Sequence, residues 1–410
     1  MIRGWRWVWR ALAAAVCLAA LPPAAGAQGL APTADVDPPA YPFRVGPLMF
    51  APAVRLQQIG VDTNVFQNEA DAREDFVATV TPEVNLFMRP RSMRVLGYLG
   101  TDFNYFRTYA EERYVAPTTR VRAEFLLSRL RPYVGVARVD TRDRPNREID
   151  ARARHVDGEL GGGLVFELSP ASFVYAAVTR QSTDYRPGER FAGIDLETAL
   201  DRNTTSVDAG IRLSLTPLTS LSLVATRAVD RFVFDPTRDA TSQSVWAEFA
   251  FAPDAIFRGT ARLGIRRFTP DNPLVGGFRG LTSRVAIVYP FLDRGTLGVG
   301  LTRDLTFSYE QDAGYFVETT GDVSYTHRIV GAWDAQARTA ITRMNYGDAV
   351  VTATGDRIDG VRLLSLGAGY NFLDQSRLGL TYEWSRRTSD TRADRRYDRR
   401  RVFASWAYAF

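Results

Sequence analysis

The sequence contains no lysine, and its single cysteine, Cys17, lies close to the start of the chain. All 51 basic residues are therefore arginines, set against 46 acidic residues. Histidine is also scarce, since only His155 and His327 occur, and no His-x-x-x-His spacing exists. Without histidine pairs or thiolates, the common metal centres have no ligands. We predict neither a cofactor nor a metal site.

The chain begins with a pattern typical of a secretory signal peptide. Arg3, Arg6 and Arg10 precede the apolar run ALAAAVCLAAL, and the small residues AGA at 25–27 follow two prolines. The apolar run is shorter than the roughly 20 residues of a membrane-spanning helix. We therefore predict that residues 1–27 are a signal peptide. Its removal lowers the formal net charge from +5 to +2, which gives little support for a nucleic-acid partner.

No second long apolar run occurs, and no linker divides the chain after about residue 45. Residues 28–47 are rich in proline and alanine, which predicts an extended periplasmic N-terminal segment. From residue 48 to residue 410 the pattern is uniform, with segments of about ten residues that alternate apolar with polar or small side chains. SVDAGIRLSL and RLGLTYEW are examples. This period of two is typical of strands whose two faces meet different environments.

The connections between these segments alternate in length. Short turns such as RPRS and SPAS separate longer polar loops at 59–75, 107–118, 141–153, 183–202, 231–241, 269–278, 309–314, 344–359 and 387–399. A soluble β-sandwich also has short alternating strands, but its loops have no reason to alternate in length. We predict an all-β fold: a transmembrane antiparallel up-and-down barrel of about 18 strands, with short periplasmic turns and longer extracellular loops.

Aromatic residues make up 12% of the chain and gather near predicted strand ends, where interfacial girdles belong. The girdle residues expected are Tyr133, Phe173, Tyr175, Phe257, Tyr289, Phe291, Tyr325, Trp333, Tyr370 and Phe372. The chain ends on RRVFASWAYAF, in which Trp406, Tyr408 and Phe410 share the lipid-facing parity. This ending resembles the terminal β-signal that the barrel-insertion machinery recognises. The last strand must pair with the first, near 49–58, because an open edge in hydrocarbon leaves backbone groups unsatisfied.

The stretch IGVDTNVFQNEADAREDFVATVTPEV is more specific. Gly60, Asp62, Asn64 and Phe66 form a loop motif, followed by the pair DF at 75–76 and TP at 81–82. This first hairpin resembles the β-barrel porin 2 family of proteobacterial outer-membrane proteins. The resemblance implies location in the outer membrane of a Gram-negative bacterium and a role beside exopolysaccharide or capsule export, with export components as partners. It implies no catalytic residue.

The predicted inward face carries charge along its length. Arg258, Arg262, Arg266 and Arg284 fall on two adjacent strands, and Arg212, Arg338, Glu248 and Asp334 lie elsewhere on the same face. Barrels of about 16–18 strands enclose a channel unless a loop fills it, and fixed charges set its solute preference. The basic strip favours anionic solutes such as uronate-containing glycans. Alternatively, the arginines pair with Glu248 across the wall and hold it rigid.

We predict a passive, non-enzymatic channel, and two alternative functions remain. The first alternative is an enzyme with an active site at the extracellular rim. His155 would be its general base, because Asp157 and Glu159 share its parity and could orient it. Inward-folded loops could instead close a docking barrel that binds a periplasmic partner through residues 28–47. Outer-membrane lipid and lipopolysaccharide are expected partners. The arginine-rich stretch at 386–401 could grip their phosphates, although its interspersed aspartates favour a solvated loop.

Overall fold

A computed structural model describes residues 41–409, except 292–293, 311–313, 347–356 and 373–375. The predicted signal peptide, most of the N-terminal segment and Phe410 lie outside the described residues. Eighteen long antiparallel strands form a closed barrel, as predicted. They are β2 (Leu48–Asp62), β3 (Asp75–Met88), β4 (Met93–Phe106), β5 (Tyr114–Phe125), β6 (Leu130–Thr141), β7 (His155–Ser169), β8 (Ser172–Tyr185), β11 (Arg202–Thr216), β12 (Thr219–Phe232), β13 (Ala240–Phe251), β14 (Arg258–Pro270), β15 (Phe278–Phe291), β16 (Gly295–Phe307), β17 (Tyr315–Arg328), β18 (Trp333–Tyr346), β19 (Ile358–Asn371), β20 (Ser376–Ser389) and β21 (Tyr397–Ala409).

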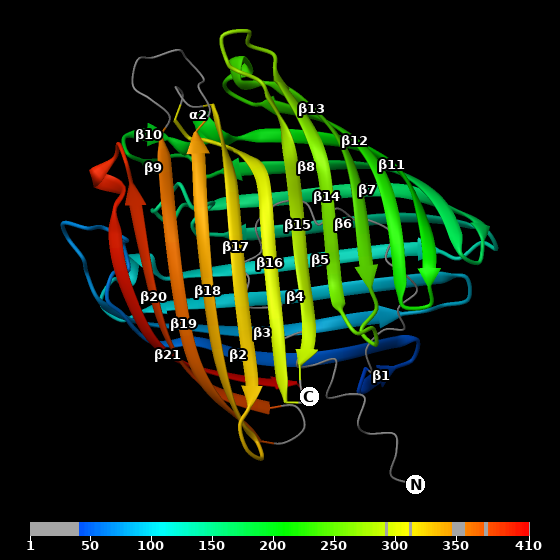
Figure 1. Ribbon diagram of the computed structural model, residues 1–410, viewed down its shortest axis with the longest axis horizontal. Helices are drawn as coiled ribbons and strands as arrows, with labels where there is room; N and C mark the ends of the chain where they lie inside the picture. Colours follow the sequence, from blue (N-terminus) through cyan, green and yellow to red (C-terminus); the bar gives the residue numbers. More distant parts are fainter. Residues whose placement is uncertain (1–40, 292–293, 311–313, 347–356, 373–375, 410) are drawn as a thin grey trace.

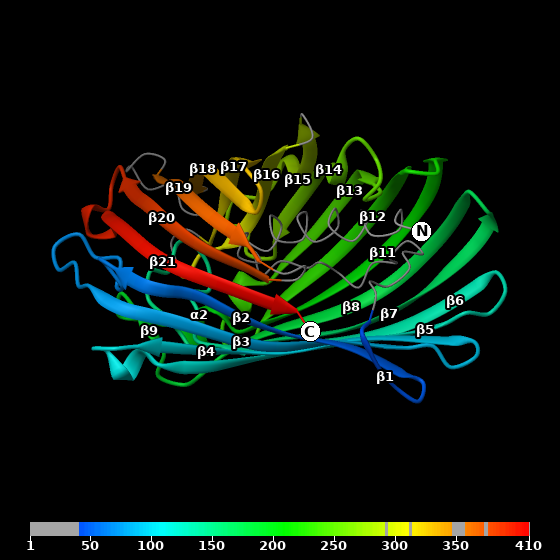
Figure 2. The ribbon, with the colours of Figure 1, turned by 90° about the horizontal axis from the view of Figure 1, so that it is seen from below.

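The first and last strands close the barrel. β2 pairs with β21 from Ala53↔Ala409 to Asp62↔Arg401, with an irregularity between Leu56 and Ile59. Figure 2 shows β21, in red, beside β2, in blue. The closure leaves neither terminal strand with an open edge, which is the condition for a sheet in hydrocarbon.

Loop length distinguishes the two ends of the barrel. Connections such as 63–74, 142–154 and 186–201 lie at one end, which we call the long-loop rim, and the tight turns lie at the other, the short-turn rim. The alternation of loop lengths read from the sequence is thus confirmed. Within the predicted extended N-terminal segment, however, Phe43–Val45 forms a short strand, β1, that pairs with Leu48–Phe50 of β2 at the short-turn rim.

The outward face of the wall is apolar. Leu263, Ile265 and Leu281 expose 56%, 55% and 67% of their surface, as a lipid-facing belt requires. Trp333 is one of several girdle aromatics that are exposed near the short turns. The prediction was wrong for Tyr133, Phe173 and Tyr175, which point inward. Tyr133 is 5% exposed, with the Arg122 guanidinium 4.3 Å from its ring centre, and Phe173 and Tyr175 pack against the cluster that contains it. Strand ends inside the barrel also take aromatics, so position alone did not reveal the facing.

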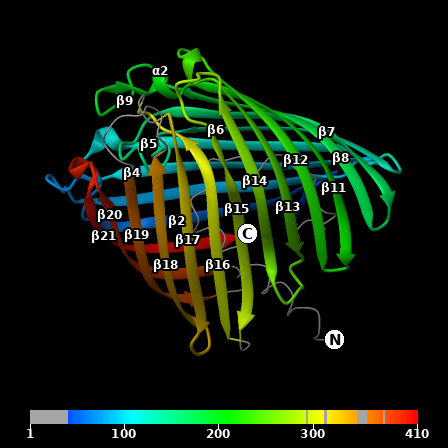
Figure 3. The ribbon, with the colours of Figure 1, turned by 45° about the horizontal axis from the view of Figure 1, so that its top comes forward.

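The long-loop rim carries the remaining regular elements. These are β9 (Arg190–Phe191), β10 (Ile194–Asp195), helix α2 (Leu196–Leu200) and the 3₁₀ turns η1 (Ala110–Glu112), η2 (Pro236–Arg238) and η3 (Ala393–Arg395). Figure 3 shows α2 and β9 gathered at this end of the barrel. Among the described residues, no helix is long and apolar enough to cross a membrane.

Strands β15 and β16 separate in the half nearer the long-loop rim. Their pairing runs from Phe291↔Gly295 only as far as Ser283↔Arg303, whereas β14 stays paired with β15 up to Phe278 and β16 stays paired with β17 up to Phe307. The two hairpins therefore diverge, which Figure 1 shows near the top of the molecule. An apolar cluster that includes Phe232, Phe268, Phe307 and Tyr315 lies beside the divergence.

Candidate functional site

The loop at 142–154, between β6 and β7, crosses the mouth of the barrel. Arg144 Nη2 donates to the carbonyl oxygen of Val65 at 2.8 Å. Arg147 Nε lies 3.2 Å from Glu318 Oε1 on β17, and Asp150 Oδ1 lies 2.8 Å from Arg387 Nη1 on β20. Glu318 and Arg387 lie on strands far from β6 and β7 in the strand order, and Val65 lies in the loop between β2 and β3. The segment, which we call the inward loop, is therefore anchored on the opposite side of the lumen.

An apolar cluster packs beneath the inward loop and joins it to two other loops. Ile149 is fully buried and belongs to one apolar cluster with Leu196 and Leu200 of the α2 segment, Phe191 of β9 and Tyr309, which follows β16. The Phe191 and Tyr309 rings meet edge to face with centroids 4.9 Å apart. Burying these side chains offsets part of the entropy lost when the inward loop and the segments that carry Leu196 and Tyr309 become ordered. Together the three loops form a roof over part of the long-loop rim.

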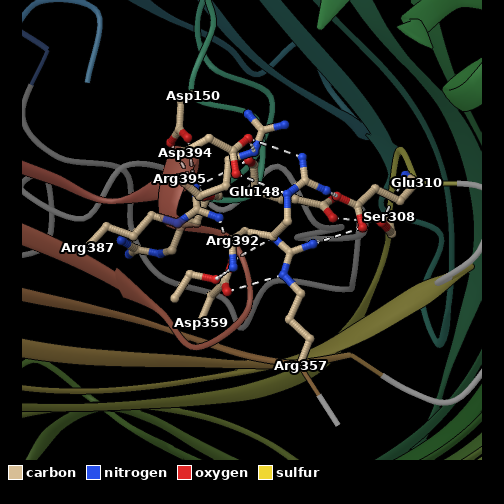
Figure 4. Close-up of polar contacts among 12 residues, drawn as sticks. Glu148, Asp150, Ser308, Glu310, Arg357, Asp359, Arg387, Arg392, Asp394 and Arg395 are labelled. Atoms are coloured by element: carbon tan, nitrogen blue, oxygen red, sulfur yellow. Dashed lines mark hydrogen bonds and ion pairs between the residues drawn. The ribbon is translucent and has the colours of Figure 1, made fainter. Parts of the chain in front are cut away.

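A chain of alternating acidic and basic groups ties the roof to the wall (Figure 4). Arg387, whose side chain is fully buried, bridges Asp150 at 2.8 Å and Asp359 at 2.7 Å. Arg357 then joins Asp359 at 2.7 Å to Glu310 at 2.8 Å. Each charge has a partner of opposite sign, which is the condition under which buried charge is tolerated. We call this network the roof lattice.

The carboxylate of Glu148, in the inward loop, is shielded from solvent. Its carboxylate accepts hydrogen bonds from Ser308 Oγ at 2.6 Å and from the Tyr309 N–H at 3.1 Å. The residue is fully buried, and this burial raises the pKa of its carboxyl to about 7, against hydrogen bonds that lower it. Glu148 therefore changes charge close to neutral pH.

The prediction that residues 386–401 form a solvated loop was wrong for part of this segment. Arg387 is 1% exposed and Arg395 is 6% exposed, and Arg395 Nη2 donates to the Tyr309 hydroxyl at 2.6 Å. Arg386 and Arg400 do face outward. The inward loop itself was recognised only as a loop. Two signals in the sequence could have revealed that this loop folds inward. One is the isoleucine Ile149 within a strongly charged stretch, and the other is the presence of oppositely charged stretches in two distant loops.

The predicted lumen charges do share the inward face, and several form one row across five strands. Register places Arg212 opposite Ser222, Ser222 opposite Glu248, Glu248 opposite Arg262, and Arg262 opposite Arg284. Arg262 Nε lies 2.7 Å from Glu248 Oε2, and Arg212 Nε donates to Ser222 Oγ at 3.0 Å. The cross-wall pairing considered from the sequence is thus present for Arg262.

The other predicted charges lie apart from this row. Arg266 Nη1 lies 2.8 Å from Asp304 Oδ1, and Arg258 stands opposite Val288 at the short-turn end of β14. Arg338 Nε is 3.7 Å from Asp322 Oδ2. Asp334 instead accepts from Arg377 at 2.7 Å, so Arg338 and Asp334 belong to separate ion pairs. The inward face carries mixed charge rather than an uncompensated basic strip.

His155 is buried among neighbouring groups rather than exposed as a catalytic base would be. It is 4% exposed, its Nδ1 lies 2.9 Å from the Ala153 carbonyl oxygen, and its ring stacks on Tyr185. Asp157 Oδ2 lies 3.6 Å from Nε2, so both ring nitrogens face neighbouring groups. His327 lies on β17 near the short-turn rim, at the opposite end of the barrel. Within the described residues, no cluster of three or more histidine, aspartate or glutamate side chains could hold a metal.

The motif of the first hairpin fastens the seam between β2 and β21. Buried Asp62 accepts from Arg399 Nε at 2.9 Å and from the Asn64 N–H at 3.1 Å, and Asn64 Nδ2 donates to the Asp398 carbonyl oxygen at 3.0 Å. Gly60 lies against the partner strand, where a Cβ atom would stand 1.9 Å from the Val402 carbonyl oxygen. Phe66 packs edge to face on Tyr109. Gly60, Asp62 and Asn64 thus join the first strand to the last, whereas Phe66 packs on the loop between β4 and β5.

The last strand presents its aromatics as expected. Trp406 and Tyr408 stack with centroids 6.0 Å apart, and Trp406 Nε1 donates to Ser376 Oγ of β20 at 2.9 Å. Phe410, the third residue of the predicted β-signal, lies outside the described residues. The terminal strand is thus paired on both sides, with β20 and with β2.

Solved structures share this fold. A BenF-like porin from Pseudomonas fluorescens Pf-5 matches with a TM-score of 0.52 at 12% identity, over 89% of this chain and 100% of that one. OccK2 (OpdF) of Pseudomonas aeruginosa in complex with glucuronate matches with a TM-score of 0.51 at 13% identity, over 88% of this chain and 98% of that one. At these identities the likeness establishes the barrel fold. No family model and no curated protein matches the chain, so the resemblance of the first hairpin to the β-barrel porin 2 family remains a prediction.

Proposed function

We propose that the protein is a non-enzymatic outer-membrane channel for small polar solutes, with the long-loop rim extracellular and the short-turn rim periplasmic. The observation that carries this proposal is a closed barrel with an apolar outer belt and a charged inner face. An apolar exterior suits lipid, and a charged interior suits water and polar solutes. The aromatic last strand supports export to the outer membrane and delivery to the barrel-insertion machinery.

Small carboxylate-bearing solutes are the proposed cargo. The row formed by Arg212, Arg262 and Arg284 presents guanidinium groups, which bind carboxylates in a forked geometry. Glu248 within the row limits the basic field, so the preference should be graded rather than absolute. The similar fold of OccK2, whose structure contains glucuronate, supports a uronic acid as the first solute to test.

The family resemblance implies polysaccharide export, which is a weaker proposal. Export components are proposed as partners only together with that role. The inward loop crosses the barrel mouth and is fixed at Val65, Glu318 and Arg387. A long glycan would have to pass beside this roof or displace it. The same observation favours the docking barrel as second candidate, because a roof that stays closed would stop conduction.

Single-channel recording of the refolded mature protein in a planar bilayer separates these functions. A channel gives steady conductance, and glucuronate should reduce the chloride current in a concentration-dependent way. The variant Arg262→Ser/Arg266→Ser should lower anion preference, whereas Arg343→Ser, which changes an outward side chain, should leave it unaltered. A silent bilayer with correctly folded protein would reject the channel and favour the docking barrel. Deleting residues 28–47 would then test docking through the N-terminal segment.

A further inference from the structure

Along the described strands, the arginines that face outward from the barrel lie near the long-loop rim. They project outward within five residues of the long-loop ends of their strands. These residues, the arginine band, are Arg138, Arg180, Arg227, Arg231, Arg267, Arg279, Arg303, Arg343, Arg362, Arg386 and Arg400. Along the described strands, outward positions in the half nearer the short turns carry no charged residue. The outer surface is thus polarised along the barrel axis.

The band is poorly neutralised by the protein. Across the described strands, its outward-facing acids are Asp140, Asp184 and Asp398. Asp140 pairs with Arg186, whereas Asp398 accepts from Trp384 Nε1 and lies 3.8 Å from Arg400 Nε of the band. Most of the band therefore faces the membrane edge without a carboxylate of its own. An excess of one charge at that depth costs free energy unless a counter-charge is present in the surroundings.

The densest part of the band lies on β12–β15. Register places Arg227 opposite Gln243, Gln243 opposite Arg267, and Arg267 opposite Arg279. Like charges directly opposite each other on a sheet are destabilising, and all three arginines are exposed. Arg231, by contrast, is held by Asp239 at 3.0 Å and Asp271 at 2.6 Å. The Arg267–Arg279 pair therefore places two exposed guanidinium groups side by side, and neither forms an ion pair with a carboxylate of the described residues.

The surroundings of this pair are amphipathic. Arg267 and Arg279 line an open pocket of about 470 Å³ at the long-loop end of the β14–β15 hairpin, together with the apolar Pro270, Val275 and Phe278. Asp271 also lines this pocket, but its carboxylate is already paired with Arg231 at 2.6 Å. On the side toward the barrel centre, the belt residues Ile265 and Leu281 are 55% and 67% exposed. A ligand held here would place an anionic group between two guanidinium groups and apolar chains on the belt below. That is the chemistry of a phosphorylated lipid at a membrane surface.

We propose that Arg267 and Arg279, with Arg227 beside them, bind a phosphate group of the outer-leaflet glycolipid, and that the arginine band as a whole orients the barrel toward that leaflet. Phosphate accepts forked hydrogen bonds from arginine and would relieve the repulsion between the two opposed side chains. The site faces lipid rather than the lumen. The proposal therefore stands whether or not the barrel conducts.

The test is retention of lipid by the full-length mature protein, measured by native mass spectrometry. The probes are lipid A carrying two phosphates, the same lipid after removal of its phosphates, and inorganic phosphate. We expect wild-type protein to retain the phosphorylated lipid about tenfold better than the dephosphorylated lipid, as the loss of charge-assisted hydrogen bonds predicts. Arg267→Gln/Arg279→Gln should lose this preference.

A matched control is Arg186→Gln/Arg190→Gln, which removes two rim arginines that lie outside the arginine band and already have aspartate partners, and it should keep the preference. Gln243 occupies the same row, so glutamine is compatible with this surface. Heat-modifiable mobility checks folding, and Arg227→Gln alone gives a milder variant with a partial loss. Equal retention of both lipids, equal losses in the two double variants, or competition by inorganic phosphate at similar concentration would each overturn the proposal.

Discussion

Arg387 and Asp150 meet at 2.8 Å although one belongs to β20 and the other to a loop that leaves the barrel between β6 and β7. The Arg387 side chain is fully buried and also holds Asp359 at 2.7 Å. This contact ties the roof to the opposite wall. A buried charge that loses its partner is costly, so the pair has more influence on the roof than a surface ion pair would have.

Replacing Arg387 should release the inward loop. In Arg387→Gln, Asp150 and Asp359 lose their shared guanidinium, and we expect a loss of about 3–5 kcal/mol of local stability. Limited proteolysis should then cut within 142–154 in the folded protein, and channel recordings should show larger and noisier currents. Arg386→Gln, the outward neighbour, is the control. An Arg387→Gln loop as protected as that of the wild type would show that the apolar cluster around Ile149 holds the roof alone.

Glu148 should make the roof sensitive to pH. Its pKa is raised by burial from 4.5 to about 7 in the docked loop, whereas a released, solvated loop would have the ordinary value. Between these two values the docked state binds the extra proton, so docking weakens as pH rises through that window, by up to about 3 kcal/mol. We expect the open fraction in single-channel traces to increase from pH 5 to pH 8.

The variant Glu148→Gln keeps the shape of the side chain but cannot ionise. Its open fraction should stay at the low-pH value of the wild type across the whole range. Ser308→Ala removes the hydroxyl donor and should weaken docking most at high pH, where the carboxylate needs that hydrogen bond. A pH dependence that persists in Glu148→Gln would assign the effect to another group.

Glu248 and Arg262 should shift ion selectivity in opposite directions. Their ion pair, at 2.7 Å, leaves little net field at this point of the row. Glu248→Gln frees the Arg262 guanidinium and should raise the anion-to-cation permeability ratio, measured as a reversal potential in a salt gradient. Arg262→Gln should lower the ratio. Both effects should shrink in concentrated salt because of screening, and shifts of the same sign in the two variants would place the pair away from the ion path.

The architecture was readable from the sequence because period-2 alternation and alternating loop lengths are local signals that repeat along the chain. The inward facing of Arg212, Glu248 and Arg262 followed from parity alone. Parity could not show which acid each arginine meets, and Asp334 of β18 pairs with Arg377 on β20, the next strand but one. The roof was missed for the same reason. Asp150 and Arg387 are 237 residues apart, and only the closed barrel brings them together.

Arg303 should stabilise the wall where β15 and β16 separate. Beyond Ser283↔Arg303 the two strands no longer exchange backbone hydrogen bonds, which is costly on a lipid-facing surface. Arg303 Nε donates to the Leu281 carbonyl oxygen at 3.1 Å, and its Nη1 donates to Thr319 Oγ1 at 2.8 Å. The side chain thus replaces part of the missing ladder. Arg303→Met retains the length of the side chain but removes its donors, and should lower the free energy of unfolding by about 1–3 kcal/mol.

The measurement is urea unfolding in lipid vesicles, followed by tryptophan fluorescence. Arg343→Met is the matched control, because Arg343 also projects outward near the long-loop rim but on β18, which is paired with both neighbouring strands. The control should lose clearly less stability than Arg303→Met. If the two variants unfold at the same urea concentration, the carbonyl at Leu281 is satisfied without Arg303, and the separation of β15 from β16 needs no side-chain support.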